Sequence, residues 1–329
     1  MKKGFMRRMC VLTMATLLMG SMTVGCGSTA KETTKTEAQE GERYKIGVFQ
    51  YMQHPSLDLA NKGFIKALEE SGISYSLDQQ NASGDPSTTN TISQKLVSDE
   101  NDLIFAIATP AAQATAALTK DIPIVITAVT DPKDAGLVES NEHPNGNVTG
   151  TSDLNPVDKQ IEVLKKLLPK AKRVGILYCS AESNSKLQAE QAREACEANG
   201  LEATDFTVSN SNEIQTVMES MVGKVDAIYL PTDNVIANAI ATVAMVADEN
   251  NLPIIAGFES NGVATLATYS VNYEALGYKA GEMAIQILKG EKKVEEMPIA
   301  YLDDDQYNIT IDDELAKKYG VDPEVIKAK

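Results

Sequence analysis

The chain has 329 residues, 43% of them hydrophobic, and its formal net charge is −16. This length suits two domains better than one. An excess of acid this large repels phosphate backbones, so the charge disfavours nucleic acid as a partner.

The first 25 residues are predicted to be a signal peptide. A basic start without acids precedes an apolar stretch, CVLTMATLLMGSMTVG, that is short for a bilayer span. The stretch ends in TVGC, and small residues directly before Cys26 resemble the lipobox of bacterial lipoproteins. That resemblance implies cleavage before Cys26 and diacylglycerol on its sulfur, which would anchor an extracytoplasmic protein to the cell membrane. An uncleaved anchor and ordinary secretion are the alternatives.

Residues 26–43 are expected to form a disordered tether behind the lipidated Cys26, because the segment is polar and lacks core-forming residues. Two further cysteines, Cys179 and Cys196, remain in the predicted mature chain. We expect both to be reduced, partly buried thiols rather than a disulfide.

From residue 44 onward the chain repeats one order of elements, β-α-β-α-β, twice. YKIGVF at 44–49 aligns with KRVGIL at 172–177, and the helix predicted after each run ends in a glycine, Gly72 or Gly200. DLIFAIATPAA likewise matches DAIYLPTDNVI, and DIPIVITAV matches NLPIIAGFE. Apolar strands alternating with helices predict an α/β protein of two similar, doubly wound lobes with parallel sheets.

Ten ordered motifs carry a family resemblance, among them HPSLD, NASGDPST, IATPAAQA, IPIVITAVTDP, NVTGTSD, ESNS and DAIYLPTDN. The pattern, over about residues 44 to 325, resembles the substrate-binding lipoproteins of ABC importers of the tryptophan/tyrosine type. That resemblance implies a type I periplasmic-binding-protein fold. It also implies a monomer without a cofactor, whose partners are an ABC permease and ATPase.

The fold of that family implies three crossings between the lobes, at a hinge that closes around the ligand. We place the crossings near 129–149, 268–273 and 298–303. The N-terminal lobe is then 44–130 plus 272–298, and the C-terminal lobe 147–270 plus 300–329. Residues 131–146, where Pro and Gly break regular structure, are predicted to be the first crossover segment.

Ligands of doubly wound sheets bind beyond the carboxyl ends of the strands, so the junctions after each strand are candidate sites. Thr109, followed by proline, is predicted to cap a helix whose free N–H groups suit a carboxylate. Thr232 and Asp233 form the matching junction in the second lobe, where an acid suits an ammonium. Glu259 is a second candidate for the ammonium. The alternatives are a plain helix cap for Thr109 and a surface acid for Glu259.

Other candidate ligand contacts follow the remaining strands. Gln53, His54 and Ser56 share the loop after the first strand, with a structural loop as the alternative. Ser83 follows the second strand, where it either contacts ligand or forms a simple turn.

Three more positions complete the candidate ligand contacts. Ala128 ends the strand before the first crossover and would leave room for a flat ligand. Glu182 and Asn184 either contact the ligand or cap the following helix.

The ligand predicted from the resemblance is an aromatic amino acid: tryptophan, tyrosine or phenylalanine. A branched amino acid, a nucleoside or a sugar is the alternative. Sugar sites in this fold usually stack the ligand on aromatic residues, and these make up only 5% of the chain, which disfavours the sugar. Three tyrosines are candidate stacking partners and equally candidate core residues: Tyr51, Tyr178 and Tyr269.

Other classes of protein lack support. The two histidines, His54 and His143, stand far apart, and no nucleophile motif or metal-spaced cluster accompanies them, so we do not expect an enzyme or a metal site. The acid run 303–305 lacks the spacing of a calcium loop. A transcription regulator would need a helix-turn-helix where the signal segment stands.

Overall fold

The computed structural model describes residues 43–260 and 262–327. The predicted signal peptide, Cys26 and nearly all of the predicted tether therefore lie outside the described residues. Across the described ranges, no helix is both long enough and apolar enough to cross a membrane.

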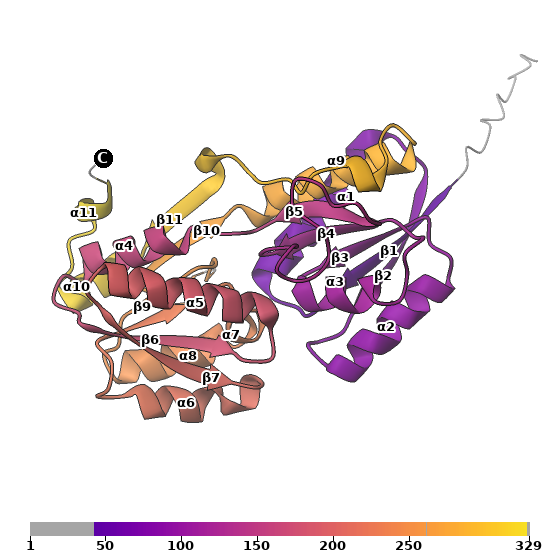
Figure 1. Cartoon of the computed structure of the whole chain (residues 1–329). Helices are drawn as coiled ribbons and strands as arrows, with labels where there is room; N and C mark the ends of the chain where they lie inside the picture. The colour runs from indigo at the N-terminus through magenta and orange to yellow at the C-terminus, as the bar shows by residue number, and fades with distance from the viewer. Residues whose placement is uncertain (1–42, 261, 328–329) are drawn as a thin grey trace, which may run out of the picture. The chain divides into compact units, whose positions relative to one another are not determined.

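The N-terminal lobe is built on a five-stranded parallel sheet in the order β2-β1-β3-β4-β5. Its strands are β1 Tyr44–Gln50, β2 Tyr75–Asn81, β3 Leu103–Ile107, β4 Ile124–Val129 and β5 Val148–Ser152. Helices α1 Pro55–Ser71 and α9 Tyr273–Leu288 cover one face, and α2 Pro86–Ser98 and α3 Thr109–Ala116 cover the other (Figure 1). Every residue of β3 and β4 is buried, as expected for a sheet covered on both faces.

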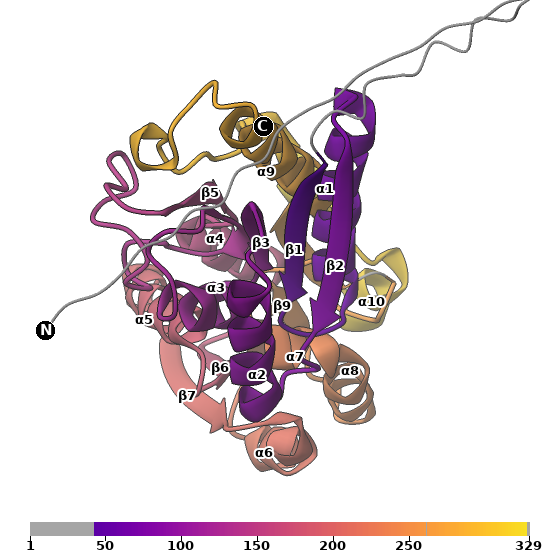
Figure 2. The same cartoon turned by 90° about the vertical axis from the view of Figure 1, so that its right-hand side faces the viewer.

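The C-terminal lobe has a six-stranded sheet in the order β11-β10-β9-β8-β6-β7, with β11 antiparallel to β10. The strands are β6 Arg173–Cys179, β7 Glu202–Val208, β8 Ala227–Leu230, β9 Ile254–Ala256, β10 Ala267–Val271 and β11 Tyr307–Ile311. The helices are α4 Val157–Leu167, α5 Ser183–Ala198, α6 Ile214–Met221, α7 Asn234–Asn238, α8 Ile240–Glu249, α10 Asp313–Tyr319 and α11 Glu324–Lys327. Helices α4 and α5 pack on one face, and α6 and α8 on the other (Figures 1 and 2). The prediction of two α/β lobes with parallel sheets is confirmed.

The first lobe extends further along the chain than the sequence suggested. Strand β5 pairs with β4, so the chain leaves this sheet only after Ser152, and residues 131–146 connect two neighbouring strands of one sheet. The predicted crossing at 129–149, and the start of the second lobe at 147, are therefore corrected to 153–156. The segment VTGTS is a buried strand despite its polar composition, so its hydrophobic pattern does not mark it as one. Gly150, at φ +144°, permits it, because a Cβ there would lie 2.1 Å from the Ile126 carbonyl oxygen.

The second crossing lies where it was predicted, and the third lies slightly later. Asn272 alone separates β10 of one lobe from α9 of the other, within the predicted 268–273. Ala300 still bonds to β5, since its N–H donates to Gly150 at 2.8 Å and its carbonyl accepts from Ser152 at 2.9 Å. The third crossing is therefore 301–306 rather than 298–303.

Helices α1 and α9 pack at a distance that only glycine permits. A Cβ on Gly63 would lie 2.0 Å from the Glu274 carbonyl oxygen, and one on Gly277 would lie 1.8 Å from that of Ala60. This contact joins a helix that follows the first strand to one that follows the second crossing, and it fixes the start of α1 relative to the hinge.

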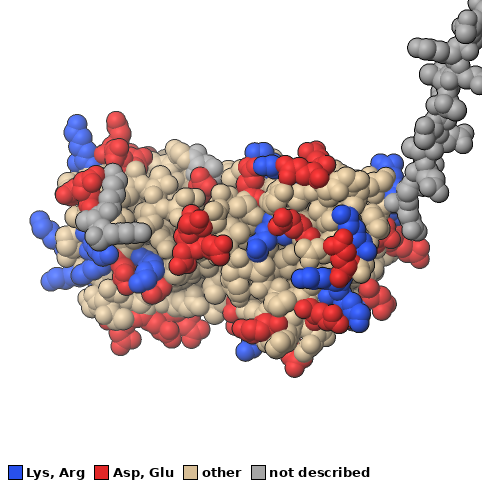
Figure 3. Space-filling model, turned by 90° about the horizontal axis from the view of Figure 1, so that it is seen from above, with Lys and Arg blue, Asp and Glu red and all other residues tan. Residues whose placement is uncertain are grey.

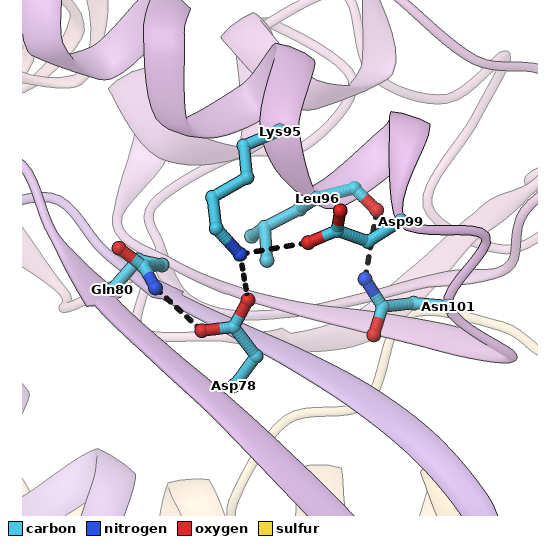
Figure 4. Close-up of polar contacts among 6 residues, drawn as sticks. All are labelled: Asp78, Gln80, Lys95, Leu96, Asp99 and Asn101. Atoms are coloured by element: carbon cyan, nitrogen blue, oxygen red, sulfur yellow. Dashed lines mark hydrogen bonds and ion pairs between the residues drawn. The ribbon is translucent and has the colours of Figure 1, made fainter.

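The edge of the first sheet is held by polar contacts around Lys95 on α2 (Figure 4). Its ammonium pairs with Asp78 on β2 and, at 2.7 Å, with Asp99 at the end of α2. Next to them the amide of Asn101 donates to the Leu96 carbonyl at 2.7 Å, which closes the turn into β3. On the molecular face in Figure 3, acidic and basic side chains are interspersed and form no basic stripe.

Candidate functional site

A small buried cavity lies between the carboxyl ends of the strands of the two lobes. Its volume is about 10 Å³, which is room for about one water molecule. The lining comes from both lobes and the crossings: His54, Leu57, Ala128, Thr130, Asp153, Asn184, Thr232, Asp233, Asn234, Ala237, Phe258 and Tyr273. The cavity therefore lies where the strand-end rule placed the site.

Hydrogen bonds close this cavity by joining one lobe to the other. The imidazole Nε2 of His54 lies 3.3 Å from Oδ1 of Asn234, at the start of α7. The amide of Asn238 donates to the carbonyl of Gln53 at 2.8 Å, and the amide of Gln113 donates to the hydroxyl of Ser183 at 3.4 Å.

Asp153 is the acid that the first crossing brings to the cavity. Its side chain is buried, with 1% exposure, and Oδ2 accepts from the hydroxyl of Tyr273 at 2.9 Å. Oδ1 is buried and has no hydrogen-bond partner within residues 43–260 and 262–327. Burial raises the pKa of this carboxyl to about 6, although the hydrogen bond from Tyr273 opposes the shift. A cation placed against Oδ1 would stabilise the ionised form.

A second acid, Glu182, stands behind the cavity at the start of α5. Its Oε2 accepts from the side-chain amides of Asn234 at 2.6 Å and Asn184 at 3.3 Å, while Oε1 has no hydrogen-bond partner among the described residues. The amide of Asn184 also donates to the carbonyl of Thr232 at 3.0 Å, which leaves Oδ1 of Asn184 unpartnered. Burial raises the pKa of Glu182, and the nearby carboxylate of Asp233 raises it further.

The start of α1 supplies the N-lobe wall. His54 is the N-cap residue of α1 by backbone geometry but makes no side-chain cap. Burial lowers the pKa of its imidazole to about 4, so the ring is neutral at pH 7. Both His54 Nδ1 and the hydroxyl of Ser56 are buried, and neither has a hydrogen-bond partner in the described part of the chain.

The rest of the wall is apolar. Leu57, Ala237, Phe258 and the ring of Tyr273 line the cavity together with Ala128. Ala128 sits at φ +53°, where the pairing of β4 with β5 shifts register between Ile126 and Val129. The irregularity carries a small side chain into the wall.

Five of the predicted contacts line the cavity: His54, Ala128, Asn184, Thr232 and Asp233. Ser56 and Glu182 are buried but are not among the lining residues. Gln53, Ser83 and Glu259 are exposed and also lie outside the lining. Ser83 forms a simple turn, in which its N–H donates to the side chain of Asn81 at 2.8 Å.

Two predicted roles need correction. The N-cap of α3 is Ala108, at φ +82°, and not Thr109, which is the first helical residue and does not line the cavity. Asp233 does not offer a free carboxylate, because its oxygens accept from the N–H of Ile236 at 2.8 Å and of Cys179 at 2.6 Å. The acid caps α7 and ties it to β6.

The three tyrosines proposed for stacking lie outside the cavity lining. The hydroxyl of Tyr51 bonds to the Gly84 carbonyl at 3.3 Å, and that of Tyr178 to Asp205 at 3.1 Å. Tyr269 stacks on Tyr307, with ring centroids 6.1 Å apart, beside a separate hollow of about 610 Å³ on the C-terminal lobe.

Seven lining residues were not predicted from the sequence: Leu57, Thr130, Asp153, Asn234, Ala237, Phe258 and Tyr273. Asp153 follows β5 directly and so obeys the strand-end rule, but the polar sequence VTGTS does not mark β5 as a strand. Phe258 likewise follows β9, in the same GFES motif as the predicted Glu259. Tyr273 comes from the second crossing, and no local signal marks it.

Within the described ranges, no group of three or more His, Cys, Asp or Glu residues could hold a metal ion. Cys179 and Cys196 are buried free thiols, as predicted. The polar groups at the cavity offer hydrogen bonds and charge to a small ligand.

Comparison with known proteins points to one family. The profile of the family described as ABC transporter substrate binding protein matches residues 45–326. A tyrosine-binding protein of Clostridioides difficile (strain R20291) is 46% identical over 311 residues, which cover 92% of this chain and 89% of that protein.

Two solved structures are similar along most of the chain. One, an ABC domain from Streptococcus pneumonia in complex with L-Trp, is 39% identical with a TM-score of 0.83, covering 87% of this chain and 98% of that one. The other is the ligand-free, open structure of a substrate binding protein with adhesive properties from Clostridium difficile. It is 44% identical with a TM-score of 0.64, and the match covers 85% of this chain and 95% of that one. The relatives are extracytoplasmic solute binders of the type I periplasmic-binding-protein fold rather than enzymes, and this chain belongs to the same family of ABC transporter substrate-binding proteins.

Proposed function

We propose that the protein captures an aromatic amino acid between its lobes and delivers it to an ABC permease. The observation that carries this proposal is a buried cavity whose wall combines unpartnered polar atoms with two aromatic rings, those of Phe258 and Tyr273. A free amino acid needs both kinds of surface. The tyrosine and tryptophan named for the two relatives support the same ligand class.

The α-ammonium of the ligand binds at Asp153. The carboxylate is nine-tenths buried or more, lines the cavity and keeps Oδ1 without a partner. Oδ1 of Asn184, also on the cavity wall and unpartnered, is a second acceptor for the same group. Two acceptors suit an ammonium, which has three donors. Burial of the pair strengthens the charge-assisted bond.

The chain is anchored to the outer surface of the cell membrane through a lipid on Cys26, and acts as a monomer with a permease and an ATPase. Support comes from the TVGC motif and from the family, whose members serve ABC transporters.

Labelling with a radioactive fatty acid tests the anchor, in cells that carry either the wild type or Cys26→Ala. The wild type should be labelled and the variant should not. Label on the variant would reject Cys26 as the lipidated residue.

Thermal unfolding with a ligand panel tests the function. The protein lacking its first 26 residues should unfold at a higher temperature with tyrosine, tryptophan or phenylalanine. A ligand at one hundred times its Kd adds about 2.7 kcal/mol to the free energy of unfolding. A panel of leucine, a nucleoside and a sugar gives the comparison. A shift with one of these, and none with the aromatic amino acids, would reject the ligand class.

A further inference from the structure

A chain of three buried side chains runs from the second lobe to the first. Oε2 of Glu182 accepts from Nδ2 of Asn234 at 2.6 Å, and Oδ1 of Asn234 lies 3.3 Å from Nε2 of His54. Glu182 is 2% exposed and His54 7% exposed. All three are held in place, since Glu182 also accepts from Asn184 and from the N–H of Asn234.

This chain fixes the proton on the imidazole of His54. Oε2 of Glu182 also accepts from the backbone N–H of Asn234 and from the amide of Asn184, so it acts as an acceptor and the Asn234 side-chain atom that faces it is the amide nitrogen. The Asn234 oxygen therefore faces His54 and must receive a proton from Nε2. A neutral imidazole carries one N–H, so Nδ1 has a lone pair and no hydrogen.

Nδ1 of His54 is consequently a buried acceptor with no partner among the residues that the structure describes. Leaving a buried acceptor unsatisfied costs about 1–3 kcal/mol, a cost that a donor on the ligand would remove. His54 lines the cavity that the lobes enclose, so the donor comes from the bound molecule. We propose that Nδ1 of His54 accepts a hydrogen bond from the ring N–H or O–H of the bound amino acid, and so selects tyrosine and tryptophan over phenylalanine.

The ring donor suits this acceptor better than the ammonium does. The cavity already offers the ammonium a carboxylate, Asp153, whose Oδ1 is free. A neutral imidazole gives a cation less stabilisation than a carboxylate does. The inference rests on the proposed function, because it assumes an aromatic amino acid in the cavity.

Calorimetric titration of the wild type and His54→Leu with tyrosine and phenylalanine tests the inference. The wild type should bind tyrosine about 10–100-fold more tightly than phenylalanine, the ratio expected from one buried hydrogen bond. His54→Leu should reduce that ratio to about threefold or less. His54→Gln, whose side chain has both a donor and an acceptor, should restore part of it.

Asn238→Ala is the matched control, because it removes another hydrogen bond between the lobes and leaves His54 intact. It should weaken both ligands by the same factor. A measurement without any variant compares tryptophan with β-(3-benzothienyl)alanine, in which sulfur replaces the ring N–H. The wild type should prefer tryptophan by about tenfold or more.

The outcomes separate this inference from the proposed function. If none of the aromatic amino acids binds, the proposed function fails. If they bind but the wild type does not favour the ligand with a ring donor, or His54→Leu leaves the preference unchanged, the role of His54 is overturned and the function stands.

Discussion

At the residue scale, the site is marked by polar atoms that the fold leaves without partners. Most buried polar groups in proteins are hydrogen-bonded, so each exception needs a reason. Five of the exceptions belong to residues at or next to the cavity: His54, Ser56, Asp153, Glu182 and Asn184. Their clustering indicates that this part of the protein is arranged for a ligand at some cost in stability.

Asp153→Asn should remove part of this cost in stability. The pKa of Asp153 is raised from 3.8 in the unfolded chain to about 6 in the folded protein. As pH rises through this range, the carboxyl of Asp153 therefore loses its proton in the unfolded chain before it does so in the folded protein. The wild type thereby loses stability, and the loss is complete above pH 6. The ligand-free variant should be more stable than the wild type by about 3 kcal/mol at pH 8, with no difference below pH 4. Urea unfolding at the two pH values checks this, and a difference that does not vary with pH would contradict it.

The same substitution should abolish tight binding. Removing the charge that pairs with a buried ammonium costs about 2–5 kcal/mol, so Kd should rise at least about 30-fold. Glu259→Ala is the matched control, because this acid is exposed and outside the cavity lining. Its Kd should change by less than about threefold. If Glu259→Ala has the larger effect in calorimetric titrations, the ammonium does not bind at Asp153.

At the scale of elements, two features position the cavity wall. The irregular pairing of β4 with β5 puts Ala128 on the wall, and the contact between α1 and α9 holds His54 and Tyr273 at the starts of these helices. Neither feature is visible in the hydrophobic pattern. Both depend on backbone approaching where only glycine fits, at Gly150 and Gly277.

Gly277→Ala should therefore be strongly destabilising. The new Cβ would lie 1.8 Å from the Ala60 carbonyl oxygen, so the helices must separate. We expect a loss of about 3 kcal/mol or more in the free energy of unfolding, although alanine favours helix more than glycine does. Gly146→Ala is the control, since its Cβ would have no neighbour nearer than 3.9 Å. Chemical unfolding of both variants checks this, and an equal effect would contradict the close packing.

At the scale of the whole described molecule, the lobes are arranged more like those of the relative solved with L-Trp than like those of the ligand-free, open relative. The TM-score is 0.83 against the relative solved with L-Trp and 0.64 against the ligand-free, open relative. The cavity of about 10 Å³ is too small for an amino acid, so a ligand requires the lobes to move apart before it enters. The bond from Asn238 to Gln53 must break in that motion.

Asn238→Ala should accordingly shift the balance toward the open form. Single-molecule fluorescence transfer between one dye on each lobe should show a larger open fraction without ligand. Ligand should dissociate faster, by about five- to tenfold for one lost hydrogen bond. Unchanged populations and rates would show that this bond does not contribute to closure.

The sequence by itself determined the class of fold and indicated the strand ends at which the cavity lies. The repeated strand–helix order predicted two parallel lobes, because local periodicity reports which elements form. The strand-end rule then selected His54, Ala128 and Asn184, since parallel strands bring their carboxyl ends to one edge. The motif pattern indicated the family.

Only the tertiary structure decided which polar groups face the cavity. Asp233 and Glu182 both follow strands, yet one is used as a helix cap and the other orients Asn234. Asp153 and Tyr273, far apart in sequence, meet because two crossings run side by side. Local pattern specifies an element and its buried face, whereas the partners of a buried polar atom depend on neighbours that the chain brings together from a distance.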